Sequence, residues 1–161
     1  MTQTISVLVE NQAGALNRIT SLFSRRAFNI HSLAVGVTDD PSVSRITIIV
    51  ESGNSEAEQV EKQLNKLVEV IKVSKLEEGS YIGRELMILK VTANQKTQGN
   101  IMTVCEIMGA KVADISLTSL TVELSDTPER LDIFQEMMRP YNILEVVRTG
   151  VIALQKGGGK I

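Results

Sequence analysis

The sequence has few residues of the kinds that metal and catalytic sites need. Its 161 residues include one cysteine, one histidine, three phenylalanines, two tyrosines and no tryptophan. A single cysteine excludes a disulfide within the chain and fits a reducing compartment. Metal sites usually combine several His, Cys or carboxylate ligands, and general acid–base catalysis most often uses histidine. The composition therefore predicts no metal site, no catalytic residues and no resident cofactor.

Charge and hydropathy exclude two further classes of partner. The net charge is −2, from 17 basic and 19 acidic residues, and no block of like charge stands out. Few aromatic side chains are available for stacking on bases, so we expect no nucleic-acid binding. No apolar run approaches the roughly 20 residues that cross a bilayer, and Met1-Thr2-Gln3-Thr4 lacks the features of a signal peptide. We expect a cytoplasmic protein without membrane contact.

Four isolated features resemble functional sites but lack the residues that would complete them. His31 has no second metal ligand in its strand, and Cys105 has no histidine near it to activate a thiolate. Asp39-Asp40-Pro41 lacks the ligand spacing of a calcium loop and is typical of a turn. Gly157-Gly158-Gly159-Lys160 lacks the Ser or Thr and the helix of a phosphate loop, so it is read as a tail.

Hydrophobic periodicity predicts the same order of elements twice. In the first half we expect strands at 5–9, 29–37, 44–50 and 70–76, and helices at 15–26 and 56–67. In the second half we expect strands at 85–92, 111–117 and 119–124, helices at 98–108 and 127–138, and one long strand or a strand pair at 143–154.

This order predicts an α+β protein of two ferredoxin-like βαββαβ domains, each with two helices on one face of an antiparallel sheet. Polar residues and glycines at 78–83 are typical of a linker. We therefore expect a first domain at 1–77 and a second at 84–161. Domains of this size are marginally stable alone, and association between chains would stabilise them.

The predicted strand at 29–37 favours a homodimer. In a ferredoxin-like unit the second strand lies at the edge of the sheet. Here that strand carries Ile30, Leu33, Val35 and Val37 but neither lysine nor proline. An apolar edge strand without such protection pairs readily with another strand.

The most informative segment is the polar turn between the first strand and the first helix. Gly14 lies where the turn becomes a helix, and helix starts favour small anions through unpaired N–H groups and partial positive charge. Asn11 and Asn29 can both donate and accept hydrogen bonds. Together these residues suit a free amino acid, which carries a carboxylate and an ammonium group. The alternative is an ordinary turn, because Gly and Asn are common turn residues.

The same residues resemble the regulatory (small) subunit of acetolactate synthase, also called acetohydroxyacid synthase. The resemblance is carried by Val7-Leu8-Val9-Glu10-Asn11, Gly14-Ala15-Leu16, Phe28-Asn29-Ile30 and Ser44-Arg45-Ile46-Thr47-Ile48. It continues through Lys62-Gln63-Leu64-Asn65-Lys66-Leu67 and Arg84-Glu85-Leu86. The second half agrees in length and in the order of elements rather than by motif.

The resemblance implies an N-terminal ACT domain and a C-terminal domain of similar topology. It also implies that the partner is the large catalytic subunit, which uses thiamine diphosphate, Mg²⁺ and FAD. The small subunit of that family stimulates the large one and confers feedback inhibition by valine, in branched-chain amino acid synthesis.

The resemblance also implies where valine binds, at the interface between two ACT domains. Asn11 and Gly14 correspond to contacts from the loop of one chain, and Asn29 and Ile30 to contacts from the second strand of the other. Strand alternation adds Val9 and Val35 as candidates for lining the side-chain pocket. 

Two other classes of function are alternatives for such a sequence. The first is a stand-alone sensor of two ACT-like domains with another partner, for instance one acting on transcription, which predicts a nucleic-acid-binding segment that the sequence lacks. The second is an enzyme on a ferredoxin-like scaffold, which lacks a catalytic constellation. Fold alone does not decide between them, because this scaffold supports many functions.

Overall fold

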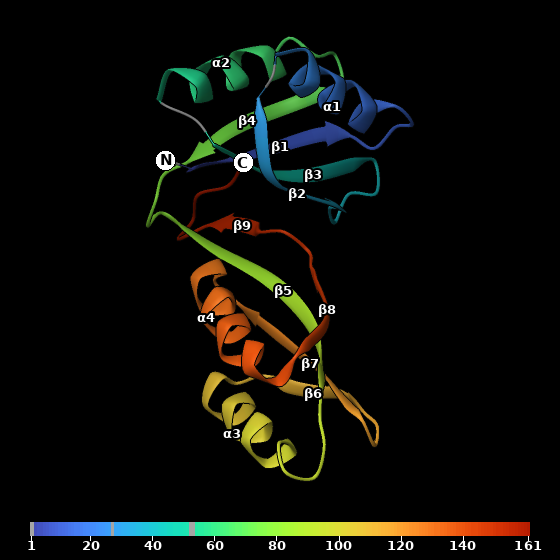
Figure 1. The fold of residues 1–161 in the computed structure, drawn as a ribbon. Coiled ribbons are helices and arrows are strands. Elements are labelled where there is room, and N and C mark those ends of the chain that lie inside the picture. The colour runs from blue at the N-terminus through green and yellow to red at the C-terminus, as the bar shows by residue number, and fades with distance from the viewer. Residues whose placement is uncertain (1, 27, 52–53) are drawn as a thin grey trace. The chain divides into compact units, whose positions relative to one another are not determined.

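The computed structural model describes residues 2–26, 28–51 and 54–161 (Figure 1). The chain divides into two compact units, one of Met1–Gly83 with Val151–Ile161 and one of Arg84–Gly150. In this grouping the first unit also includes residues 78–83, expected as a linker, and the last eleven residues, expected in the second domain.

The first unit contains a four-stranded antiparallel sheet with the strand order β2-β3-β1-β4. Two helices lie on one side of this sheet (Figure 1). In chain order the elements are β1 (Thr2–Glu10), α1 (Ala15–Arg26), β2 (Asn29–Val37), β3 (Val43–Glu51), α2 (Asn54–Leu64) and β4 (Val70–Leu76).

The core of the first unit lies between the helices and the sheet. Alternate residues of β1 and β3 point toward the helices, as the period of two along a strand requires. Helix α1 contributes Phe23, whose ring makes an edge-to-face contact with Phe28 at a centroid distance of 6.0 Å. The buried residues of this core are Ile5, Val7, Val9, Ile19, Phe23, Ile46, Ile48, Val50, Val60, Leu64 and Val73.

The other face of the sheet is in contact with the end of the chain. Strand β9 (Ile152–Gln155) belongs to the first unit. Val151 donates its N–H to Ser32 Oγ at 3.1 Å, and Arg45 Nη2 donates to the Ala153 carbonyl at 2.9 Å. Val151 and Ala153 are buried, and these hydrogen bonds tie the segment to β2 and β3.

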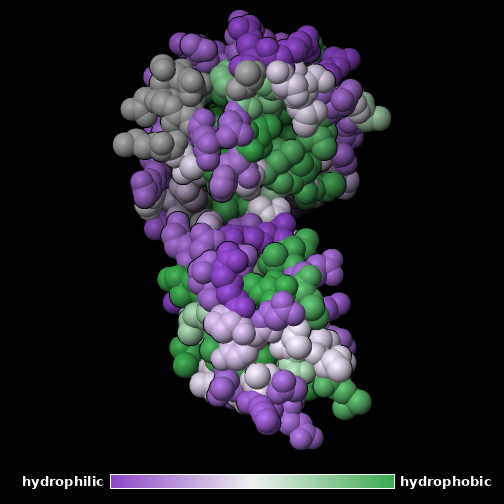
Figure 2. Space-filling view, in the orientation of Figure 1, coloured by the Kyte–Doolittle hydropathy of each residue, from purple (hydrophilic) through white to green (hydrophobic). Residues whose placement is uncertain are grey.

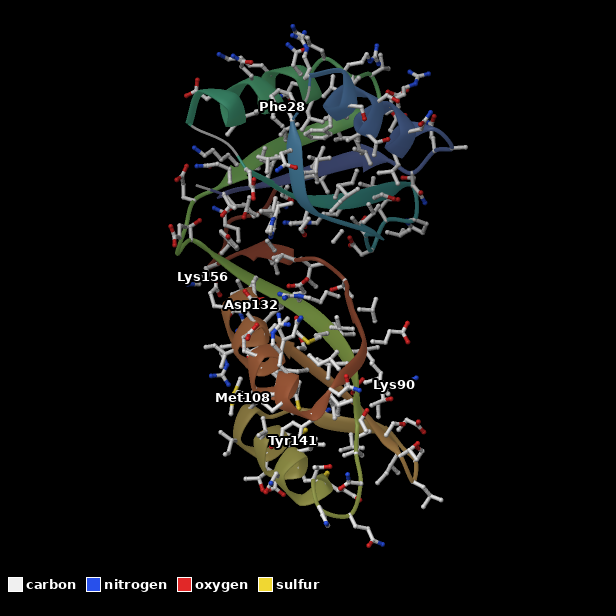
Figure 3. All side chains as sticks on the ribbon, viewed as in Figure 1. Phe28, Lys90, Met108, Asp132, Tyr141 and Lys156 are labelled. Atoms are coloured by element: carbon white, nitrogen blue, oxygen red, sulfur yellow. The ribbon has the colours of Figure 1, made fainter. Side chains whose placement is uncertain are left out.

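The second unit repeats the topology of the first, with the strand order β6-β7-β5-β8. Its elements are β5 (Tyr81–Thr92), α3 (Gln98–Met108), β6 (Lys111–Ile115), β7 (Ser119–Asp126), α4 (Pro128–Met138), a 3₁₀ turn (Arg139–Tyr141) and β8 (Ile143–Arg148). Met108 and Tyr141 pack against its core, whereas Lys90 lies on the side of the sheet away from the helices (Figure 3). The predicted fold class, two βαββαβ units with α+β content, is confirmed.

Capping residues set the ends of the two helices in the second unit. Gly109 follows α3 with φ 77°, a left-handed conformation that costs glycine little, and its N–H reaches the Cys105 and Glu106 carbonyls. Thr127 precedes α4 and accepts a hydrogen bond from the Arg130 N–H. Pro128 occupies the first helical turn, where no N–H is needed.

An ion pair between Glu85 and Arg148 links the strands of the second unit. Glu85 is buried and accepts from Arg148 Nη2 at 2.7 Å and from the Gly150 N–H at 3.1 Å. Arg148 also donates to Asp132 on α4 at 2.6 Å. The hydrogen bond to Glu85 is the main reason that the pKa of Arg148 lies above its usual value. The network joins β5, β8 and α4.

Several element boundaries differ from the sequence predictions for local reasons. The strand expected from residue 85 begins at Tyr81, because it continues into the pairing with β9. The strand expected at 111–117 ends at Ile115, since Ser116 turns the chain through hydrogen bonds to Ser119. The segment 143–154 forms two strands, separated by Gly150 with φ 82°. The helix expected at 56–67 runs from Asn54 to Leu64 instead.

Candidate functional site

The candidate site begins at the loop between β1 and α1. Gly14 has φ 92°, and apart from Gly14 and its two chain neighbours no described residue has an atom within 4 Å of the position a Cβ would take there. The Arg18 N–H donates to the Gly14 carbonyl, which places Gly14 at the start of α1. The Ala15 N–H donates to the Gln12 carbonyl at 3.2 Å, and the N–H groups of Leu16 and Asn17 have no partner within the helix by its geometry. An open space therefore lies beside N–H donors that favour an anion.

Asn11 is held in place by the turn between β2 and β3. Its backbone N–H donates to the Ser42 carbonyl at 2.7 Å, and its side-chain Nδ2 donates to the Pro41 carbonyl at 2.9 Å. Asp40 shapes this turn by accepting hydrogen bonds from the Ser42 hydroxyl and N–H, which lower the pKa of the Asp40 carboxyl. Because Nδ2 is engaged, Oδ1 of Asn11 is the atom available to accept from a ligand.

Asn29 is oriented in a comparable way at the first residue of β2. Its side chain is exposed, and Nδ2 donates to Glu51 Oε2 at 2.9 Å. Its Oδ1 is again the available acceptor. Ile30, the next residue, is half-buried against the core of the first unit.

The two valines predicted to line the side-chain pocket lie in different environments. Val9 is buried in the core beneath the helices, with 3% of its surface exposed. Val35 lies on the edge strand and is 48% exposed. In this arrangement only Val35 presents its side chain to a ligand or a second chain.

The structure does not bring the two groups of predicted contacts together within one chain. Strands β1 and β2 both pair antiparallel with β3 and therefore run parallel to each other. Asn29 pairs with Glu51 at one end of β3, while Glu10, beside Asn11, pairs with Val43 at the other end. The eight residue steps from Val43 to Glu51 separate these ends by about 26 Å. A site that uses both Asn11 and Asn29 requires two chains.

The edge strand β2 offers the surface for such an association. It is the outermost strand of the first sheet, and Val35 and Val37 are exposed on it. Hydrophobic residues gather on the front of the first unit below the helices, where β2 faces the viewer (Figure 2). 

Three contacts around the candidate site residues were not predicted from the sequence. Glu51 binds Asn29, the Asp40 turn holds Asn11, and Glu69 closes the loop from the α2–β4 connection. The Glu69 carbonyl accepts from the Glu10 N–H at 2.9 Å, and its carboxylate pairs with Arg18 at 2.5 Å. These pairs depend on strand register and on contacts distant in sequence, which no local motif reveals.

Two of the isolated candidates from the sequence, His31 and Cys105, lie in different environments. His31 is exposed, and Cys105 is buried, which raises the pKa of its thiol. Across the described residues no group of three or more His, Cys, Asp or Glu side chains could hold a metal ion. In the same residues, none of the helices has the length and apolar character to cross a membrane.

Comparisons with known proteins identify both units. Residues 5–72 match the family described as the AHAS small subunit-like ACT domain, so the first unit is an ACT domain, as predicted. Residues 84–157 match the family described as the small subunit of acetolactate synthase. The class of protein is thus an ACT-domain regulatory protein with a second, characteristic C-terminal domain.

Relatives along the whole chain narrow this class to one family. The acetolactate synthase small subunit of Mycolicibacterium smegmatis is 47% identical over 97% of this chain and 92% of its own length. The isozyme 3 small subunit of Escherichia coli is 41% identical over 98% and 97%. The crystal structure of the acetolactate synthase small subunit from Thermotoga maritima superposes with a TM-score of 0.92, at 31% identity and 99% coverage of both chains. The chain belongs to the family of acetolactate synthase small subunits.

Membership of this family fixes the general role. Small subunits of acetolactate synthase are regulatory and non-catalytic, and a small subunit implies a large catalytic subunit as its partner. The resemblance noted in the sequence, its regulatory role and its place in branched-chain amino acid biosynthesis are confirmed.

Proposed function

We propose that this chain binds valine at the interface of a homodimer of its ACT domains and transmits feedback inhibition to the catalytic subunit. Without valine it stimulates that subunit, which holds thiamine diphosphate, Mg²⁺ and FAD, and the assembly acts in the cytoplasm. The observation that carries the proposal is the orientation of Asn11 and Asn29. Each amide uses Nδ2 within the chain and leaves Oδ1 as an acceptor for an ammonium group.

Antiparallel pairing of β2 with β2 of a second copy supports the two-chain site. If the pairing is centred on Leu33, the middle of the strand, Asn29 of one copy lies opposite Val37 of the other. Val37 immediately precedes the turn whose Pro41 carbonyl holds Asn11. The symmetry therefore brings Asn29 of one copy to the end of the sheet that carries Asn11 and Gly14 of the other copy. A dimer of this kind has two equivalent sites.

Valine has groups that match the two halves of this site. Its carboxylate suits the N–H groups at the start of α1 beside Gly14. Its ammonium group suits the acceptor oxygens of Asn11 and Asn29. Its branched apolar side chain suits Ile30 and Val35 on the edge strand, whereas Val9 acts from the core by supporting the loop.

Asn11→Ala and Asn29→Ala are each expected to weaken valine binding about 10- to 150-fold, since a hydrogen bond to a charged group contributes about 1.5–3 kcal/mol. Calorimetric titration with valine measures the effect. Asn65→Ala is a matched control, because Asn65 is also exposed and its Nδ2 also donates to a backbone carbonyl, that of Glu61 on α2. Equal affinities for Asn29→Ala and Asn65→Ala would remove Asn29 from the site.

The purified chain alone is expected to form no acetolactate, and adding it to its large subunit is expected to raise that subunit's rate. The physical reason is that the chain lacks a catalytic constellation and acts by binding its partner. Co-purification followed by an activity assay with 2-oxo acids measures both properties. Failure to associate with the large subunit would favour a stand-alone sensor, and turnover by the chain alone would contradict the regulatory role.

A further inference from the structure

Glu51 lies next to the proposed site and contacts one of its residues directly. Asn29 and Glu51 are opposite each other in the β2–β3 register, and Asn29 Nδ2 donates to Glu51 Oε2 at 2.9 Å. The other carboxylate oxygen, Oε1, is 3.8 Å from His31 Nδ1, which is too long for a hydrogen bond. Among the described residues, the short side-chain contact of Glu51 is therefore the one to Asn29.

The chemistry of the two groups determines how the Asn29 amide is oriented. An amide carries a donor and an acceptor on one carbon and can present either one to a ligand by rotating. An ionised carboxylate only accepts hydrogen bonds, so it binds the amide nitrogen and leaves the amide oxygen for the ligand. Without Glu51, the amide is free to turn its NH₂ group toward the ligand, where it would repel an ammonium group.

The two asparagines of the site differ in how they are fixed. Asn11 is held by the Pro41 carbonyl, a backbone group that no side-chain substitution removes. Asn29 is held by a side chain that is exposed and lies on the neighbouring strand. The orientation of Asn29 can therefore be altered by substitution without changing Asn29 itself or the loop at Gly14.

We propose that Glu51 is a positioning residue that orients Asn29 and thereby makes the site select ligands with a free ammonium group. The inference rests on the proposed function, because it assumes that the effector binds at Asn29. The partial positive charge at the start of α1 and the Asn29 oxygen fixed by Glu51 then define opposite ends of the site. A zwitterionic α-amino acid fits this polarity, whereas a carboxylic acid of the same shape without the amino group lacks one half of the contacts.

The test compares Glu51→Ala with Glu51→Gln by calorimetric titration with valine. Glu51→Ala removes the acceptor and is expected to weaken binding about 10-fold, the effect of losing one hydrogen-bonded orientation. Glu51→Gln keeps an acceptor oxygen for Asn29 and is expected to stay within about threefold of the unmodified chain. An equal loss in both variants, or no loss in Glu51→Ala, would overturn the positioning role.

Two further measurements separate positioning from general damage. In the Asn29→Ala background, Glu51→Ala is expected to add less than about twofold, because the residue on which it acts is gone. Glu58→Ala, which removes an exposed carboxylate from α2, is the matched control and is expected to leave affinity unchanged. A full second loss from Glu51→Ala in the Asn29→Ala background would contradict the inference.

The proposed selectivity for an ammonium group is tested with a second ligand, 3-methylbutanoate, which has the carbon skeleton of valine but no amino group. We expect no measurable binding of this acid to the unmodified chain at concentrations that saturate with valine, and binding with comparable affinity would overturn the proposed selectivity. Failure of the proposed function gives a result that differs from failure of the Glu51 inference. If the proposed function is wrong, the unmodified chain does not bind valine, or Gly14→Asp binds valine normally, whatever the Glu51 variants do.

Discussion

Gly14→Asp is expected to abolish measurable valine binding, a loss of at least about 100-fold in affinity. The substitution acts in two ways at one position. It places a carboxylate in the open space beside the helix start, where the carboxylate of valine would bind, and like charges repel at short range. It also forces a side chain onto a backbone with φ 92°, at a cost of order 1–2 kcal/mol. Calorimetric titration measures the loss.

Gly79→Asp is the matched control for this change. Gly79 has φ 80°, and a Cβ there also meets no described atom within 4 Å. The control therefore introduces the same charge and the same backbone cost in a turn outside the site. Stimulation of the large subunit is expected to persist in both variants, because the site serves the effector. Normal valine affinity in Gly14→Asp would place the site elsewhere.

Val35→Lys is expected to weaken the homodimer by about 100-fold or more. The residue lies on the exposed edge strand, so a two-fold symmetric dimer interface at β2 would contain two lysines. The interface would remove their charges from water. Sedimentation equilibrium at micromolar concentration measures the dissociation constant. Valine affinity is expected to fall with dimerisation, because each site takes residues from both chains.

The opposite edge of the same sheet provides the control for Val35→Lys. Ile71 lies on β4, the other edge strand, and is 54% exposed. Ile71→Lys adds the same charge to an edge of similar character and is expected to leave the dimer intact. The dimer interface at β2 would be contradicted if the unmodified chain were monomeric, or if Val35→Lys and Ile71→Lys weakened the dimer equally.

The fold was largely predictable because its signals are local. Hydrophobic periodicity and the residues typical of element ends predicted the helices at 15–26 and 98–108 and the strands at 29–37 and 70–76 with the bounds that the structure has. The return of Val151–Ile161 to the first unit was not predicted. It depends on contacts of Val151 and Ala153 with side chains more than a hundred residues earlier, and periodicity carries no information about such contacts.

The site was predictable only in part, for a similar reason. Asn11, Gly14 and Asn29 stand out because turns and helix starts have recognisable sequences. Glu51 does not, since the role proposed for it follows from the register that places it opposite Asn29. Strand alternation also predicted that both Val9 and Val35 line the side-chain pocket, although Val9 is buried in the core and Val35 is exposed at the sheet edge.

The central claim is that each valine site is built from two chains, and mixing two defective variants tests it most directly. Gly14→Asp damages the loop half of the site, and Asn29→Ala damages the strand half. After subunit exchange, each heterodimer contains one site with both defects and one site with none. Calorimetric titration of the exchanged mixture is predicted to recover unmodified valine affinity at one site per heterodimer, although neither variant binds with that affinity alone. No recovery in a mixture shown to contain heterodimers would contradict a site shared between two chains.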